Sequence, residues 1–240
     1  MIEIHAHLLP GVDDGPESLE ESLALAQAFI DDGVRHVVAT PHVYPGLFPN
    51  TRSSNLKALA LFQQALAERG ISLSLQVAGE VRLTEHIPHL LETNELPFLG
   101  ELDGYRTLLL EMPDGQIPVG TDRLVAWLLE RGIRPVIAHP ERNRAIRDKP
   151  KLGLELVQMG CLLQVTAGAL IGGFGAPVQK AARFLVKKKA VAAIASDAHN
   201  LAARAPCMGA AFTWLSNQHG EEVAVALTQT GPAKLCGYVG

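Results

Sequence analysis

The sequence predicts an α/β protein, an irregular seven-stranded (β/α)7 barrel that forms a single domain over residues 1–240. Four amphipathic segments each end at a glycine and run directly into an apolar, partly β-branched stretch, which is typical of helix, tight turn and strand. Strands and helices alternating at this spacing indicate a parallel sheet covered on both faces. Seven such units in one domain favour a barrel. The glycines that end the helical segments are Gly33, Gly70, Gly132 and Gly160.

Each unit can be placed along the chain. The first helix is predicted to follow Ser18 as its N-cap, and the second to end before Gly70. An open doubly wound sheet remains an alternative, but no glycine-rich phosphate loop follows any strand. The apolar faces of these helices are assigned to Leu19, Leu23, Ala26 and Ile30, and to Leu56, Leu59 and Leu66. Strands are expected near residues 2–5, 35–40, 73–79, 106–111, 134–138, 161–165 and 191–196.

Composition narrows the class of protein. With 48% hydrophobic and 19% charged residues, the chain can bury a large core. We find neither a signal-peptide pattern nor an apolar run of about 18 residues, so we expect a cytoplasmic protein without membrane insertion. The formal net charge of −4 argues against a nucleic-acid partner, although a local basic patch could hide within that sum. The three cysteines are widely spaced and indicate neither disulfides nor a thiolate metal site.

Histidine and carboxylate residues stand just after six of the seven predicted strands. In a βα barrel these strand ends form the rim that carries the chemistry. His5 and His7 are two residues apart on a strand, so their side chains point to one side. A single histidine or carboxylate at such a position is usually a helix cap or a loop contact, but the whole set of them predicts a functional site. Its members are His5, His7, Asp14, His42, Glu80, Glu111, His139, Asp197 and His199.

Imidazole and carboxylate ligands without thiolate suit manganese, iron, zinc or cobalt. Nine ligands exceed what one ion needs, so the sequence predicts two or three metals close together. Such a cluster activates water and clamps the oxygens of an in-line displacement, which favours hydrolysis of a phosphate ester. Arg142 and Arg204 follow two of the predicted strand ends and could bind phosphate oxygens. With Asp197 and His199, they form the candidate catalytic set.

The successive motifs carry a family resemblance. "IEIHAHLLPGVDDG", "VVATPH", "VAGE", "LLLEMP", "VIAHPERNR", "QVTAGAL" and "IASDAHN" are similar to those of the PHP superfamily (polymerase and histidinol phosphatase). More closely, they resemble its branch of bacterial metal-dependent protein-tyrosine phosphatases of capsule and exopolysaccharide biosynthesis. The resemblance implies an irregular seven-stranded barrel with three divalent ions, commonly manganese. It also implies a partner, the tyrosine-rich tail of a bacterial tyrosine autokinase. A homo-oligomer is left open.

The resemblance further implies how the ligands divide among three metals. The first would take His5, His7, Glu80 and Asp197. The second would take Glu80, Glu111 and His139, so that Glu80 bridges two ions. The third would take Asp14, His42 and His199. Arg142 and Arg204 would complete a phosphate site. The loop "HVYPGLFPNTRSSN" after His42 is where this sequence departs from the family pattern; we expect it to line the mouth, and its role in substrate preference stays open.

The expected mechanism is attack by metal-activated hydroxide without a phosphoenzyme. A cysteine phosphatase needs a Cys-x5-Arg loop, yet Ala167 and Thr213 stand six residues after Cys161 and Cys207, and Cys236 lies too near the end. One alternative is a phosphoesterase of the same superfamily for a small molecule such as histidinol phosphate or a nucleotide. A less favoured one is a non-catalytic, metal-stabilised regulatory protein. Metal-dependent amidohydrolases also begin with two histidines on a barrel strand, but they usually place a metal-bridging lysine where this chain has Glu111, which argues against that class.

Overall fold

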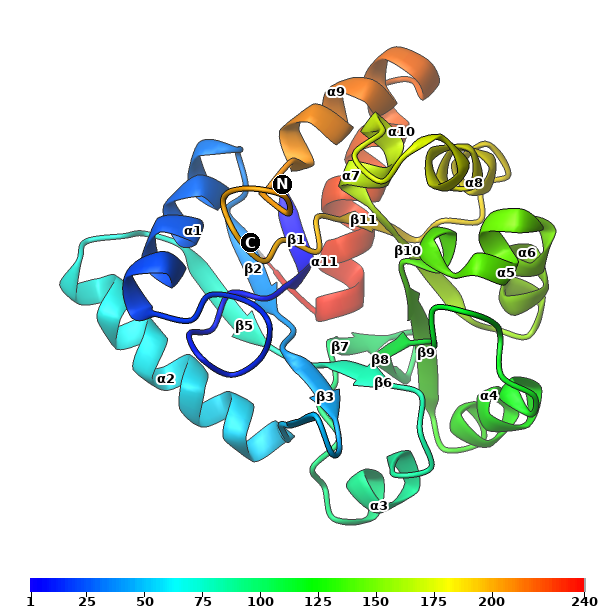
Figure 1. Ribbon diagram of the computed structural model, residues 1–240, viewed down its shortest axis with the longest axis horizontal. Coiled ribbons are helices and arrows are strands. Elements are labelled where there is room, and N and C mark those ends of the chain that lie inside the picture. Colours follow the sequence, from blue (N-terminus) through cyan, green and yellow to red (C-terminus); the bar gives the residue numbers. More distant parts are fainter. Residues whose placement is uncertain (240) are drawn as a thin grey trace.

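The computed structural model describes residues 1–239 as helices packed around two β-sheets (Figure 1). The first sheet is parallel, in the order β1-β2-β5, and the second has the order β11-β10-β9-β8-β6-β3-β4, with β7 paired to β8. The strands are β1 (Ile2–Ala6), β2 (His36–Ala39), β3 (His42–Tyr44), β4 (Phe48–Pro49), β5 (Ser74–Val77), β6 (Glu80–Arg82), β7 (Gly100–Leu102), β8 (Tyr105–Glu111), β9 (Ile133–Ala138), β10 (Leu162–Thr166) and β11 (Ala193–Ala195).

Helices connect most of the strands and cover the outside of the sheets (Figure 1). They are α1 (Leu19–Asp31), α2 (Arg52–Glu68), α3 (Ile87–Glu92), α4 (Thr121–Leu129), the 3-10 turn η1 (Pro140–Arg142), α5 (Arg144–Asp148), α6 (Lys151–Gln158), α7 (Ala167–Ile171), α8 (Ala176–Lys187), α9 (Met208–His219), α10 (Glu221–Val225), the π-helical turn η2 (Ala226–Thr230) and α11 (Gly231–Cys236). None of the helices described in residues 1–239 is both long and apolar enough to cross a membrane.

The α/β class is confirmed, and a strand lies at each of the seven predicted positions, but the predicted barrel of seven strands is not confirmed. The strands form two sheets because two of them break, at Pro41 between β2 and β3 and at Gly79 between β5 and β6. Proline has no N–H for the sheet, and glycine weakens a strand. The second sheet is also mixed, since β4 and β7 pair antiparallel with their neighbours.

The breaks keep the strands in register. Val37 pairs with Leu75 before them and His42 pairs with Glu80 after them, at the same offset. A separate parallel bridge links Ala6 to Ala198, beyond β11. The two sheets therefore curve around one centre, which Figure 1 shows from the end where most parallel strands finish. The prediction of one domain over residues 1–240 stays a prediction, and its last residue, Gly240, lies outside the described residues.

Local signals explain the helix ends. Ser18 caps α1 in a capping box with Glu21, as the sequence predicts. The predicted glycine ends are confirmed too, with φ between +66° at Gly70 and +101° at Gly160, values that favour glycine. The predicted apolar faces are only partly right, because Leu19, the first residue of α1, and Leu56, the fifth residue of α2, are 40% and 45% exposed.

A second, smaller core fills the space inside the curved sheets. It joins residues such as Ile4, Leu109 and Val136 to Leu235 of α11. The hydroxyl of Thr107, near the start of β8, donates to the carbonyl oxygen of Leu235 at 2.7 Å. Helix α11 therefore closes the end where the strands begin, and the opposite end is left for polar side chains.

Candidate metal centre

All nine predicted ligands come together in one cluster, at the end of the molecule where β1, β8, β9 and β11 finish and β3 and β6 begin. The cluster is deep: His5, His7, Glu80 and Asp197 are at most 1% exposed. Burial of so many ionisable groups is costly unless they are paired or bind metal. They come from strands β1, β3, β6 and β8 and from the segments after β1, β9 and β11: His5, His7, Asp14, His42, Glu80, Glu111, His139, Asp197 and His199.

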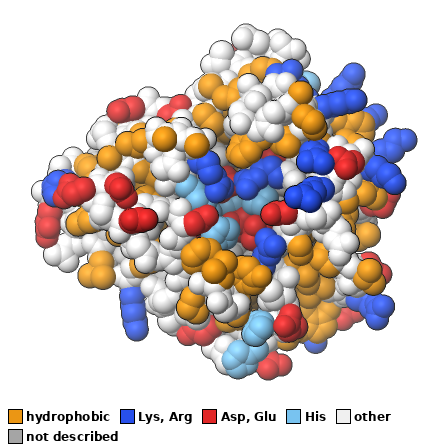
Figure 2. Space-filling view, viewed as in Figure 1, with side chains coloured by type: hydrophobic (Ala, Val, Ile, Leu, Met, Phe, Trp, Pro, Cys, Tyr) orange, Lys and Arg blue, Asp and Glu red, His pale blue; other side chains and the backbone are white. Residues whose placement is uncertain are grey.

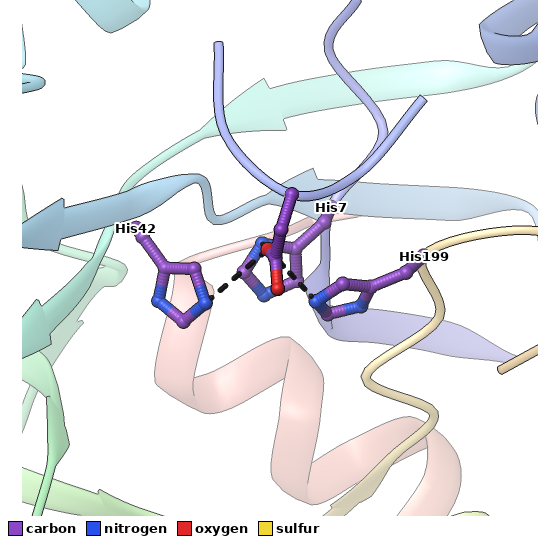
Figure 3. Close-up of side chains that lie close together, drawn as sticks. His7, His42 and His199 are labelled. Carbon is purple, nitrogen blue, oxygen red and sulfur yellow. Dashed lines mark ion pairs between the residues drawn. The ribbon is translucent and has the colours of Figure 1, made fainter. Parts of the chain in front are cut away.

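The side chains form four overlapping groups whose ligand atoms lie within 4.8 Å of one another. One group agrees with the third implied metal and adds His7 to it. Figure 3 shows His42 and His199 pointing at one carboxylate, that of Asp14, with Nε2 to Oδ1 distances of 3.4 and 3.2 Å. The groups are His7, Asp14, His42 and His199; His5, His7 and Glu80; His5, His139 and Asp197; and His42, Glu80 and Glu111.

The position of Glu80 agrees with a bridging role. Its Oε1 lies 2.7 Å from Nε2 of His139, and its Oε2 lies 3.0 Å from Nδ1 of His42. The structure groups Glu111 with His42 and Glu80, whereas the resemblance implied His139 in that set. Glu80 belongs to two of the four groups and contacts histidines from three strand ends, so it stands at the middle of the cluster.

Two buried histidines are held so that one ring nitrogen faces the cluster. Nδ1 of His5 lies 2.8 Å from Oε1 of Gln164, and Nδ1 of His7 lies 2.6 Å from Oδ2 of Asp13. A proton on Nδ1 satisfies both contacts and leaves the Nε2 lone pair free, which is how metal-binding histidines are usually oriented. The sequence interpretation assigned no role to Asp13 or Gln164. A polar residue inside the apolar run of β10 was the available signal for Gln164.

The same atoms test whether the site suits metal ions. Nε2 of His5, His7 and His199 and Oδ1 of Asp197 are buried, and they have no hydrogen-bond partner within residues 1–239. Buried polar atoms without a partner are rare and need an explanation. Four such atoms converge on one place and are all donors that a borderline divalent ion accepts, so the residues fit a metal cluster.

Electrostatics in the cluster reflect this density of charge. Burial by itself raises the pKa of Asp197, but the charges of His5, Arg142 and Arg204 and the nearby ring of His7 hold it well below its usual range. Burial lowers the pKa of His42, and Asp14 and Glu80 outweigh that effect and raise it to about 10. Without a cation, protons on His5, His7 and His42, whose pKa values are raised, therefore balance part of the carboxylate charge. Burial instead lowers the pKa of His139 and His199.

Arg142 and Arg204 lie beside the cluster, as the sequence predicts. Nη1 of Arg142 and Nη2 of Arg204 both donate to Oδ2 of Asp197. About a quarter of each arginine side chain is exposed, so both reach from solvent to the centre. The guanidinium of Arg142 lies 5.1 Å from the ring centre of Phe174.

A third arginine was missed by sequence reasoning. Nη1 of Arg82 lies 2.9 Å from Oε1 of Glu111. Arg82 is two residues after Glu80 on β6, and this period of two places both side chains on one side of the strand. The spacing could have identified it. In Figure 2, Lys and Arg side chains lie above, to the right of and below a centre of His, Asp and Glu.

The backbone is strained at two of the predicted ligands. His139 has φ +32° and Asp197 has φ +54°, in the left-handed region that residues with a Cβ avoid. Strain of this kind costs about 1–3 kcal/mol and is concentrated at functional sites. The strain at His139 and Asp197 therefore supports a functional site, because it costs stability and serves to position these two side chains.

The cysteines are unsuited to nucleophilic catalysis. Burial raises the pKa of Cys161 to about 12. Burial, with the charges of Glu3 and Asp32, raises that of Cys207 to about 12 as well. Because the thiolate is the nucleophile, neither thiol is reactive at neutral pH.

Comparison with known proteins adds a family and a fold. The model of the family "Capsular polysaccharide synthesis, CpsB/CapC" matches residues 1–236. The chain is 33% identical over 229 residues to tyrosine-protein phosphatase YwqE of Bacillus subtilis, covering 95% of this chain and 89% of YwqE.

Solved structures of known proteins also resemble the fold, at high and at low sequence identity. One comes from crystal structures of YwqE from Bacillus subtilis and CpsB from Streptococcus pneumoniae, described as unique metal-dependent tyrosine phosphatases. It has a TM-score of 0.91 at 32% identity, and covers 100% of this chain and 96% of that one. Another, a variant of an organophosphorus hydrolase, has a TM-score of 0.60 at 15% identity, covers 98% of this chain and 92% of that one, and shows the fold alone.

Proposed function

The chain belongs to the CpsB/CapC family of capsular polysaccharide synthesis, and from this premise we propose that it is a metal-dependent protein-tyrosine phosphatase. The observation that carries the proposal is the convergence of four buried donor atoms without hydrogen-bond partners within residues 1–239, next to two arginines. The similarity to YwqE supports the reaction. The protein is thus an enzyme that hydrolyses phosphotyrosine in protein.

The proposed cofactors are three divalent ions, with manganese favoured over iron, zinc and cobalt. The nine clustered side chains would hold them, with Glu80 shared between two ions. When bound, such ions lower the pKa of water and withdraw charge from phosphate oxygens. Nine nitrogen and oxygen donors without thiolate support this choice of metals.

The protein's own groups then bind and orient the phosphate. Arg142 and Arg204 already converge on one carboxylate oxygen of Asp197, and the same pair of guanidinium groups can bind two oxygens of a phosphate. Asp197 belongs to the proposed catalytic set because it contacts both arginines, and His199 because its Nδ1 lies 3.6 Å from Oδ1 of Asp197. Asp13 and Gln164 keep the rings of His7 and His5 in place.

The depth of the site supports phosphotyrosine over shorter phosphoamino acids. The cluster is buried, and Phe48 of the loop after His42 stacks on the His42 ring with centres 5.3 Å apart. The mouth is therefore partly apolar and suits an aryl group. We propose that the physiological substrate is the tyrosine-rich tail of a bacterial tyrosine autokinase that controls capsule or exopolysaccharide production, and that the enzyme acts in the cytoplasm.

The proposal is tested by phosphate release from a phosphotyrosine peptide, a phosphoserine peptide and histidinol phosphate, each with manganese and with excess chelator. We expect turnover of phosphotyrosine that chelator abolishes and that vanadate barely reduces. Asp197→Asn should remove activity, and Asp148→Asn, an exposed control, should keep it. Preference for histidinol phosphate would instead indicate a small-molecule phosphoesterase. No turnover of any ester by the manganese-loaded protein would refute catalysis.

A further inference from the structure

Basic residues are concentrated on one side of the molecule. Segments 142–158 and 176–189, here called the basic face, contain ten Lys and Arg residues and two acidic residues. Their formal charge is +8, so the rest of a chain of net charge −4 carries −12. Figure 2 shows Lys and Arg side chains gathered on the side of the central cluster where Figure 1 places α5 and α8.

The basic face is one continuous surface. Helix α5 packs against α8, and η1, which contains Arg142, packs against both helices. The side chains of Arg144, Lys180, Lys187 and Lys189 are exposed. Arg147 pairs with the adjacent Asp148 at 2.9 Å, whereas Arg144 and the lysines of this face have no carboxylate of residues 1–239 within ion-pair distance. Their charge is therefore available to an external partner.

The shape of the basic face indicates the kind of partner. Strands β10 and β11 are parallel, so α8 must run from the end that holds the candidate metal centre back to the opposite end. Its 12 residues span about 18 Å. The basic face thus begins beside Arg142 and continues along α8, on the side of the molecule, toward the end opposite the candidate metal centre. A flat membrane could touch the rim or the wall, but an extended polypeptide can follow both.

We infer that the basic face binds an acidic polypeptide segment of the phosphotyrosine substrate, which lies along α5 and α8 when the phosphotyrosine is at Arg142. This rests on the proposed function. A phosphorylated, acidic chain is complementary to the surface, and charge complementarity mainly raises the rate of association. An extended chain advances about 3.3 Å per residue, so about six residues would span the length of α8.

The test uses the manganese-loaded protein and two phosphotyrosine peptides, flanked on both sides by eight glutamates or eight glutamines. We expect Arg144→Glu with Lys180→Glu to lower kcat/KM for the glutamate peptide roughly tenfold or more, and to leave p-nitrophenyl phosphate unchanged. Lys187→Glu with Lys189→Glu should lower kcat/KM for the peptide with eight glutamates on each side but not for a peptide with only three, which is too short to span α8. Lys57→Glu with Lys234→Glu, an equal change of charge on exposed residues elsewhere, is the control.

Binding of a fluorescent, unphosphorylated glutamate peptide, followed by anisotropy, separates this inference from catalysis. Loss of binding in the basic-face variants alone supports the inference even if no ester is hydrolysed. Equal losses for the glutamine peptide or in the control variant overturn it. It is also overturned if the protein hydrolyses phosphotyrosine but the variants behave as wild type, or if it binds anionic phosphatidylserine vesicles and not the peptide.

Discussion

Oδ2 of Asp13 lies 2.6 Å from Nδ1 of His7, and both side chains are buried. Asp13 also accepts hydrogen bonds from the backbone N–H of His42 and, through Oδ1, of Gly15. One carboxylate thus fixes the tautomer of His7 and ties the loop that carries Asp14 to the start of β3. Ligands that are oriented in this way bind metal more tightly than free ones.

Asp13→Asn should therefore weaken metal binding without removing a ligand. The amide can place its oxygen toward only some of the three donors, so the His7 ring loses its fixed tautomer. We expect about 10- to 100-fold lower manganese affinity, measured by titration calorimetry and by the manganese concentration that gives half-maximal activity. Asp148→Asn should change neither value, and equal affinities in Asp13→Asn and wild type would contradict the orienting role.

Metal binding should release protons and weaken as pH falls. In the metal-free protein, burial opposes protonation, but Asp14 and Glu80 raise the pKa of His42 to about 10. Burial also opposes protonation of His7, but the neighbouring Asp13 raises the pKa of His7 well above its usual range. At pH 7 both rings hold protons that a metal must displace. Calorimetry in buffers of different ionisation enthalpy measures the protons released, and an absence of release would show that the rings are neutral.

The same shift predicts how metal-free stability depends on pH. The folded pKa of His42 lies above its ordinary value of 6.5. The folded state therefore binds the proton more tightly, and the contribution to stability is fully present below pH 6.5. It is lost as pH rises toward 10. Denaturant unfolding with chelator should show a downward trend between these values that is smaller in His42→Gln, because His5 and His7, whose pKa values are also raised, remain.

Phe174 should matter through Arg142. Their cation–π contact holds the guanidinium near Asp197, and the close approach of Phe174 to the chain depends on Gly168, where a Cβ would lie 3.1 Å from the ring. Phe174→Leu keeps an apolar side chain but loses the π face. We expect inhibition by inorganic phosphate to weaken about 2- to 30-fold, matching about 0.5–2 kcal/mol for such a contact. Phe174→Tyr should restore it, and an equal loss in both variants would exclude the contact.

The thiols should be dispensable. Since burial raises the pKa of Cys161 and Cys207 to about 12, alkylating reagents find little thiolate at pH 7.5. Phosphatase activity should survive iodoacetamide, and Cys207→Ser should keep kcat near the wild-type value. Rapid inactivation by iodoacetamide that Cys207→Ser prevents would instead identify a reactive thiol near Arg204.

The clustering of the nine candidate ligands could be predicted from the sequence because they follow apolar runs, and parallel strands bring their ends to one edge. Their grouping could not, since it depends on which side chains face each other across the centre: His42, rather than His139, joins Glu80 and Glu111. The strand breaks were also missed. Pro41 and Gly79 resemble ordinary strand ends, and only the pairing of His42 with Glu80 shows that each strand resumes.

Gly79 connects that break to the site, and its replacement should damage fold and metal binding together. A Cβ there would lie 2.7 Å from both Cγ of Pro97 and Cγ2 of Val43, so the chain before Glu80 must shift. We expect Gly79→Ala to destabilise the protein by about 1–3 kcal/mol in denaturant unfolding. Because Glu80 contacts histidines in or next to three strands, manganese affinity should fall as well.

Gly115→Ala is the matched control, since nothing lies within 4 Å of its Cβ and its φ is not positive. A Gly79→Ala protein that loses stability but binds manganese as wild type would show that the cluster tolerates movement of β6.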